Sequence, residues 1–263
     1  MRSKKLLVAN WKMNPLTFKE AERIGHSLDQ GIKSMNKKDF TEKVEIVVCP
    51  PALYLNCLKK SQFWKLGIQN IHWETRGAFT GEISPRMADN AGCEYAIIGH
   101  SERRIYFKET DQIVNQKLKT ALENSLNPIL CVGETKEERE KNNTNYIIRK
   151  QIELALKNVS ILALPKLIIA YEPVWAINSA QNSNNEADTP DDIMVITILI
   201  RKILKELYHS DVTDKVKIIY GGSVNQKNIA GLTEIDVHDG FLVGTASLSM
   251  FDFLPIIKRV YNQ

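Results

Sequence analysis

Eight short apolar runs, each followed by a segment with helical periodicity, recur along the 263-residue chain. Several runs are apolar at successive positions, which is typical of parallel strands buried on both faces. We predict strands at Lys5–Asn10, Val44–Cys49, Leu66–Gln69, Tyr95–Gly99, Pro128–Val132, Lys166–Tyr171, Val216–Tyr220 and Gly240–Val243.

Apolar side chains repeat with helical spacing between these runs. Longer helices are expected over Thr17–Met35, Asp111–Asn124, Asn145–Leu156 and Asp191–Tyr208, and shorter ones over Pro51–Lys60, Pro85–Ala91, Gln226–Leu232 and Ser249–Val260. Thr17 and Thr189 are predicted N-caps, and Ser101 is a candidate cap for a further short helix.

This alternation of strands and helices restricts the fold to the α/β class. An open doubly wound sheet is compatible with it, but eight repeats in about 250 residues favour a closed (β/α)8 barrel. No low-complexity linker divides the chain, so we predict a single domain over residues 1–263. The polar stretch Asn178–Asp188 has no periodicity and is predicted to be a loop.

The composition is 43% hydrophobic and 25% charged, and the net charge of +4 is spread over short lysine pairs. This pattern argues against a nucleic-acid partner, and no apolar run approaches the ~20 residues of a membrane span. Four cysteines show no metal-ligand spacing, so we expect no metal site and reduced thiols in a cytoplasmic protein. Cys49 and Cys131 end apolar runs and are expected to be buried.

Reactive side chains follow three of the predicted strands, at the end where such barrels carry their chemistry. Lys12 follows the first strand, His100 the fourth and Glu172 the sixth. Taken singly, they have ordinary explanations as a surface lysine, a structural histidine and a loop-edge carboxylate. Their occurrence together favours a catalytic set. Glu172, placed between apolar neighbours, is expected to have a raised pKa and to act as a base, and His100, at a helix N-terminus, is expected to be neutral.

Small residues follow the last two strands. Ser223 comes after a Gly-Gly pair, and Gly244 is followed by Thr245. Such segments form tight turns, and they also let backbone N–H groups approach a phosphate, which barrels often bind at these two positions.

The motifs taken together resemble the triosephosphate isomerase family. The matching segments, in order, are Asn10–Asn14, Gly77–Pro85, Ile98–Arg104, Cys131–Glu134, Tyr171–Ile177, Tyr220–Val224 and Gly240–Gly244. The resemblance spans essentially the whole chain. It implies a TIM barrel that interconverts dihydroxyacetone phosphate and D-glyceraldehyde 3-phosphate through an enediolate, in glycolysis and gluconeogenesis, without a cofactor or metal.

The resemblance also implies a role for each matching residue. Glu172 would remove the proton, His100 would polarise the carbonyl, and Lys12 would supply positive charge. The remaining residues would hold the substrate (Asn10, with Asn178, Ser223, Gly244 and Thr245 around the phosphate), support Lys12 and His100 (Glu102), and contact the partner subunit of a homodimer (Thr80).

Two positions depart from the family pattern. The lid that begins at Pro173 continues with Asn178-Ser179-Ala180-Gln181, where the family usually has Gly-Thr-Gly-Lys, and it is several residues longer. Thr245 stands where the family commonly has glycine, so its Cβ narrows the phosphate pocket.

Two alternative functions remain open at this point. Another phosphosugar isomerase or epimerase would keep the phosphate site without requiring Lys12, His100 and Glu172 together. A non-catalytic barrel that binds phosphometabolites, or one with a role in surface adhesion, would need no base.

Overall fold

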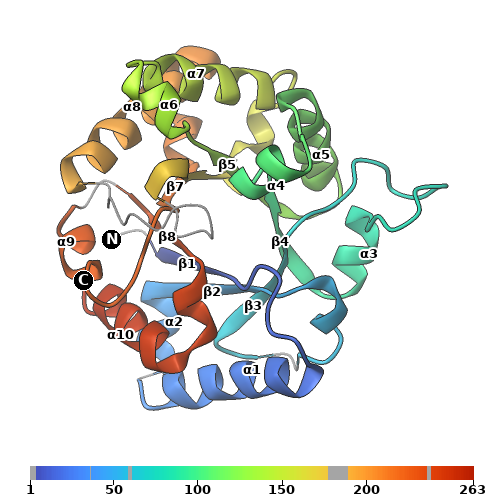
Figure 1. Ribbon diagram of the computed structural model, residues 1–263, viewed down its shortest axis with the longest axis vertical. Coiled ribbons are helices and arrows are strands. Elements are labelled where there is room, and N and C mark those ends of the chain that lie inside the picture. The colour runs from blue at the N-terminus through green and yellow to red at the C-terminus, as the bar shows by residue number, and fades with distance from the viewer. Residues whose placement is uncertain (1–3, 36, 59–60, 177–188, 236–237) are drawn as a thin grey trace.

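A computed structural model describes residues 4–35, 37–58, 61–176, 189–235 and 238–263 of the protein. Parallel strands form a closed barrel in chain order, and β1 pairs with both β2 and β8 (Figure 1). The strands are β1 (Lys5–Asn10), β2 (Val44–Cys49), β3 (Trp64–Ile68), β4 (Cys93–Ile98), β5 (Asn127–Val132), β6 (Ile168–Tyr171), β7 (Lys217–Tyr220) and β8 (Gly240–Val243). The predicted (β/α)8 fold is confirmed.

Helices surround the barrel as an outer layer (Figure 1). They are α1 (Phe18–Lys33), α2 (Lys37–Lys43), α3 (Pro85–Asn90), α4 (Ser101–Tyr106), α5 (Asp111–Glu123), α6 (Lys136–Glu140), α7 (Thr144–Ala155), α8 (Pro190–Tyr208), α9 (Ile229–Glu234) and α10 (Met250–Tyr261). Short 3-10 turns lie at Ala52–Tyr54, Ile161–Lys166, Val174–Ala176, Asp211–Lys215 and Thr245–Leu248. Among the described residues, no helix has the length and apolar character needed to cross a membrane.

Local capping explains where several helices begin. Thr17 forms a capping box with Glu20, and Thr189 accepts a hydrogen bond from the backbone N–H of Asp192, so both predicted caps are confirmed. The prediction for Ser101 is wrong. His100 is the N-cap of α4, since its ring accepts from the Glu102 N–H, and Ser101 is the first helical residue.

The expected helix over Pro51–Lys60 is also wrong. Its described part holds a 3-10 turn at Ala52–Tyr54, and Lys59 and Lys60 lie outside the described residues. The strands β3 and β4 begin two residues earlier than predicted, at Trp64 and Cys93.

Alternate residues of the strands other than β3 serve two different cores. In β1, Leu6 and Val8 fill the barrel interior, whereas Leu7 and Ala9 face the layer beneath the helices. Cys49 and Cys131 belong to the interior set and are buried, as predicted. Both cores are almost entirely apolar, so the polar chemistry is confined to the ends of the strands.

Candidate active site

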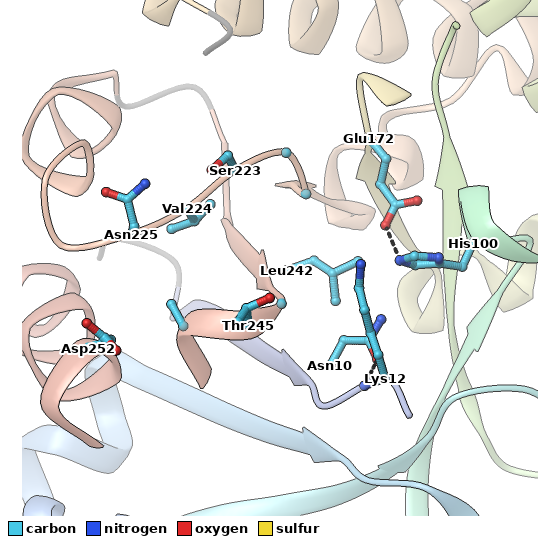
Figure 2. A pocket seen from close by; sticks show the side chains of 14 residues that line it. Asn10, Lys12, His100, Glu172, Ser223, Val224, Asn225, Leu242, Thr245 and Asp252 are labelled. Carbon is cyan, nitrogen blue, oxygen red and sulfur yellow. Dashed lines mark hydrogen bonds and ion pairs between the residues drawn. The ribbon is translucent and has the colours of Figure 1, made fainter. Parts of the chain in front are cut away.

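A cavity of about 230 Å³ opens at the carboxyl ends of the strands. Figure 2 shows the side chains of Lys12, His100 and Glu172 directed toward a common space. The residues that follow β7 and β8, including Ser223, Gly244 and Thr245, line the same cavity. The structure therefore brings together most of the predicted site residues that it describes. Glu102 does not line the cavity but contacts Lys12 and His100. Thr80 lies on a separate loop.

Lys12 is held in place by three neighbours. Its ammonium group lies 2.7 Å from Glu102 Oε1, and its backbone N–H donates to Asn10 Oδ1 at 3.0 Å. Its carbonyl accepts a hydrogen bond from the Gln69 amide at 2.8 Å. These contacts hold Lys12 at a φ of 53°, which is uncommon for a residue with a side chain. Lys12 is thus a positioned cation in the cavity, and its interpretation as an ordinary surface lysine does not fit.

The hydrogen bonds of His100 define its neutral tautomer. Nδ1 accepts from the Glu102 N–H at 3.2 Å, so the proton of a neutral ring is on Nε2. Nε2 lies 3.2 Å from Glu172 Oε1 (Figure 2). A donor N–H of the imidazole therefore faces the cavity beside the carboxylate.

Glu172 is a buried carboxylate with only 2% of its surface exposed. Its Oε2 accepts from the Ser101 N–H at 3.2 Å, and its own N–H donates to Val132 O at 2.7 Å. Burial and then the Glu172 charge raise the pKa of Cys131 well above its ordinary value. The adjacent Cys131 thiol therefore stays protonated and does not act as a second base. The arrangement suits a single carboxylate acting as a base.

Comparison with known proteins identifies the family of this chain. The triosephosphate isomerase family profile matches residues 5–260. A triosephosphate isomerase of Dictyoglomus turgidum is 45% identical over 97% of this chain and 99% of its own length. One from Dictyoglomus thermophilum is 43% identical with the same coverage, and one from Clostridium botulinum is 43% identical over 96% and 98% of the two chains.

The chain belongs to the triosephosphate isomerase family. The predicted resemblance is confirmed, and with it the assignment to a family of isomerases. Asn178, predicted to contact the phosphate, lies outside the described residues, as do the other residues from 177 to 188. Within the described part of the chain, no three His, Cys, Asp or Glu side chains gather in a way that suits a metal ion.

A buried hydrogen-bond network next to Glu172 is not predicted by the sequence patterns. The Glu134 side chain is fully buried and accepts hydrogen bonds from Tyr171 Oη at 3.3 Å and Trp175 Nε1 at 3.0 Å. Arg139 stacks on Trp175 and lies 3.7 Å from Glu134 Oε1. Burial raises the pKa of Glu134, against the lowering effect of the Trp175 hydrogen bond. The network fixes the chain on both sides of Glu172.

Gly133, directly after β5, has no room for a side chain. A Cβ there would lie 1.8 Å from the backbone oxygen of Glu172. We expect Gly133→Ala to displace the Glu172 main chain, lowering kcat about tenfold or more through misplacement of the base and stability by about 1–3 kcal/mol. Steady-state kinetics and thermal unfolding measure the two effects.

Gly231→Ala is the matched control for Gly133→Ala, because a Cβ at this glycine of α9 would meet no atom within 4 Å. It should leave kcat unchanged. A Gly133→Ala variant with the kcat of the parent protein would show that the backbone contact does not position Glu172.

Thr245 begins the 3-10 turn after β8 and lines the cavity beside Gly244. We expect Thr245→Gly to keep phosphate binding, with a change of at most about 1–2 kcal/mol, the scale of local backbone strain. Inhibition by inorganic phosphate measures the affinity. An unchanged value shows a neutral position, and a large gain shows that the Thr245 Cβ restricts the pocket more than we expect.

Proposed function

We propose that this protein interconverts dihydroxyacetone phosphate and D-glyceraldehyde 3-phosphate. The convergence of Lys12, His100 and Glu172 on one cavity carries this proposal. The reaction moves a hydrogen between adjacent carbons of one molecule. It requires a base, an electrophile and a grip on the phosphate, and it transfers no electrons to or from an external partner.

Each side chain suits one step of this reaction. The Glu172 carboxylate takes a proton from the carbon next to the carbonyl, and the C–H electron pair passes into an enediolate. The His100 Nε2–H hydrogen-bonds the carbonyl oxygen and moves protons between the two oxygens, while the Lys12 ammonium stabilises the negative charge that develops there. Glu172 then returns its proton to the other carbon, which completes the isomerisation.

The phosphate end of the substrate fits the opposite side of the cavity. Ser223, Gly244 and Thr245 line it there, and Asn10 lies next to Lys12. We assign the phosphate to the backbone N–H groups of this side, because such groups suit an anion at a strand–helix junction. We assign the same role to Asn178. The Lys12 ammonium then stands between the phosphate and the reacting carbons.

A coupled assay of glyceraldehyde 3-phosphate turnover tests the proposal. The expected result is isomerisation without any added metal or cofactor, abolished in Glu172→Gln. Turnover of a different phosphosugar alone would favour another isomerase or epimerase. If the folded protein binds phosphate but turns over no substrate, the non-catalytic barrel would be the remaining interpretation.

We further propose a homodimer in which Thr80 contacts the partner subunit. Thr80 lies on the loop between β3 and α3, which extends away from the barrel (Figure 1). Large apolar side chains near the cavity end of the fold, Met13 and Leu16, are 90% and 87% exposed, and Phe79 on the projecting loop is 42% exposed. Burial of this surface would favour association. Sedimentation equilibrium should give twice the 29.9 kDa chain mass.

The cellular setting follows from the proposed substrate. Triose phosphates are intermediates of glycolysis and gluconeogenesis, so we place the enzyme in the cytoplasm. The four cysteines are free thiols, in keeping with a reducing compartment. We also infer that residues 1–263 form one domain, since the first and last strands pair with each other.

A further inference from the structure

Arg104, on α4, makes three contacts directly behind the candidate active site. Its Nε donates to Gly99 O at 2.8 Å, and its Nη2 donates to Cys131 O at 3.3 Å. Its Nη1 lies 2.6 Å from Asp111 Oδ1 at the start of α5. One guanidinium therefore joins the backbone of two neighbouring strand ends.

One of these carbonyls is next to a reacting residue in the chain, and the other is linked to a reacting residue through one hydrogen bond. Gly99 follows β4 and directly precedes His100. Cys131 precedes Val132, whose carbonyl accepts the N–H of Glu172 at 2.7 Å. A continuous path thus runs from the backbone of His100 through Arg104 and β5 to the backbone of Glu172.

The surroundings of Gly99 leave the guanidinium little freedom. Gly99 has a φ of +70°, and a Cβ there would lie 2.9 Å from Val114 and 3.1 Å from Arg104 Nη2. The Arg104 side chain is only 18% exposed. A planar fork with several fixed donors can bridge two carbonyls and a carboxylate at once, which a lysine ammonium on a flexible stem does poorly.

We propose that Arg104 is a positioning residue that sets the separation between His100 Nε2 and Glu172 Oε1. It touches neither group directly and acts through the strand ends that carry them. The proposal rests on the proposed function, since it assumes that His100 and Glu172 perform the proton transfers. Displacement of either group by a fraction of an ångström is enough to slow a reaction that depends on their alignment.

If the role of Arg104 were purely structural, its substitution would affect kcat no more than substitution of an arginine with similar contacts far from the site. The chain contains such an arginine. Arg201 donates to the carbonyls of Thr213 and Val216 and lies 2.8 Å from Asp239 Oδ2. These partners precede β7 and β8, at the end of the barrel opposite the cavity. Arg201 thus makes the same kinds of contact without any link to the base.

The experiment compares Arg104→Lys and Arg104→Ala with Arg201→Ala. We expect Arg104→Ala to lower kcat about tenfold or more, with KM changed by less than about threefold, because the phosphate grip after β7 and β8 is untouched. Arg104→Lys should fall between Arg104→Ala and the parent protein. Arg201→Ala should lose similar thermal stability and keep its kcat. Asp111→Asn, which leaves both carbonyl contacts of Arg104 in place, should also keep its kcat.

Chemical rescue of kcat adds a measurement that a purely structural role of Arg104 would not affect. Millimolar guanidinium chloride, compared with sodium chloride of equal ionic strength, should restore part of the kcat of Arg104→Ala and none of the activity of Glu172→Gln. If Arg104→Ala does not fold, the separate effects of Arg104→Lys on kcat and on KM test the proposal.

Two results would overturn the proposal. One is an unchanged kcat in both Arg104 variants, and the other is an equal loss of kcat in Arg104→Ala and Arg201→Ala. Failure of the proposed function itself looks different, because the parent protein would then turn over no triose phosphate at all. Full turnover in His100→Gln and Glu172→Gln would instead overturn the roles assigned to these two side chains.

Discussion

Glu172→Asp is expected to lower kcat by about two to three orders of magnitude while leaving the affinity for a phosphate inhibitor nearly unchanged. The substitution keeps the charge and the carboxylate but withdraws it by one methylene. The carboxylate now lies 3.2 Å from both His100 Nε2 and the Ser101 N–H, so the shorter side chain loses contact with at least one of them. The base then stands too far from the substrate carbon for efficient proton transfer.

One further variant separates the position of the carboxylate from its basicity, and a second variant is a control. Glu172→Gln keeps the length and removes the base, so its loss of kcat should exceed that of Glu172→Asp. Glu94→Asp, a half-exposed carboxylate paired with Lys65 at 2.7 Å, should behave like the parent protein. The interpretation fails if Glu172→Asp retains more than about a tenth of the parental kcat. Inorganic phosphate inhibition, measured on each variant, confirms that the site is still formed.

The barrel was predictable because its strands are continuous apolar runs. The strands β1, β2 and β8 begin and end as predicted, and a charged residue (Lys4, Lys43 or Asp239) directly precedes each run. The short helices α2, α4 and α6 were not assigned ranges. They contain five to seven residues each, which is too few for a clear helical period. The cap of α4 was misplaced because a histidine ring, rather than a serine hydroxyl, accepts its N–H.

The candidate site was predictable only in part, for a related reason. Lys12, His100 and Glu172 each follow an apolar run, so the barrel rule alone locates them. Glu134 and Arg104 contact partners that barrel closure brings near. Trp175 is 41 residues from Glu134 in sequence, and Cys131 is 27 residues from Arg104. No local pattern marks such contacts, although the Cys131–Glu134 and Ile98–Arg104 motifs contain both residues.

Lys12→Met is expected to reduce kcat/KM by about three orders of magnitude or more, because it removes the cation that serves both the phosphate and the enediolate. The contributions of Lys12 to phosphate binding and to enediolate stabilisation affect different kinetic constants. Loss of attraction for the bound phosphate raises KM, and loss of stabilisation of the developing oxyanion lowers kcat. Methionine has nearly the length of lysine, so the change removes charge with little change in volume. The Glu102 carboxylate, 2.7 Å away in the parent protein, would add an uncompensated negative charge near the substrate.

Lys65→Met is the matched control for Lys12→Met. Lys65 is also ion-paired, 3.0 Å from Glu45 and 2.7 Å from Glu94, but its partners lie at the opposite end of the barrel strands. Its removal should leave both kcat and KM unchanged. Comparable losses in the two variants would mean that lysine charge acts through stability or long-range attraction. A loss confined to KM in Lys12→Met would restrict Lys12 to phosphate binding and leave the enediolate charge to His100.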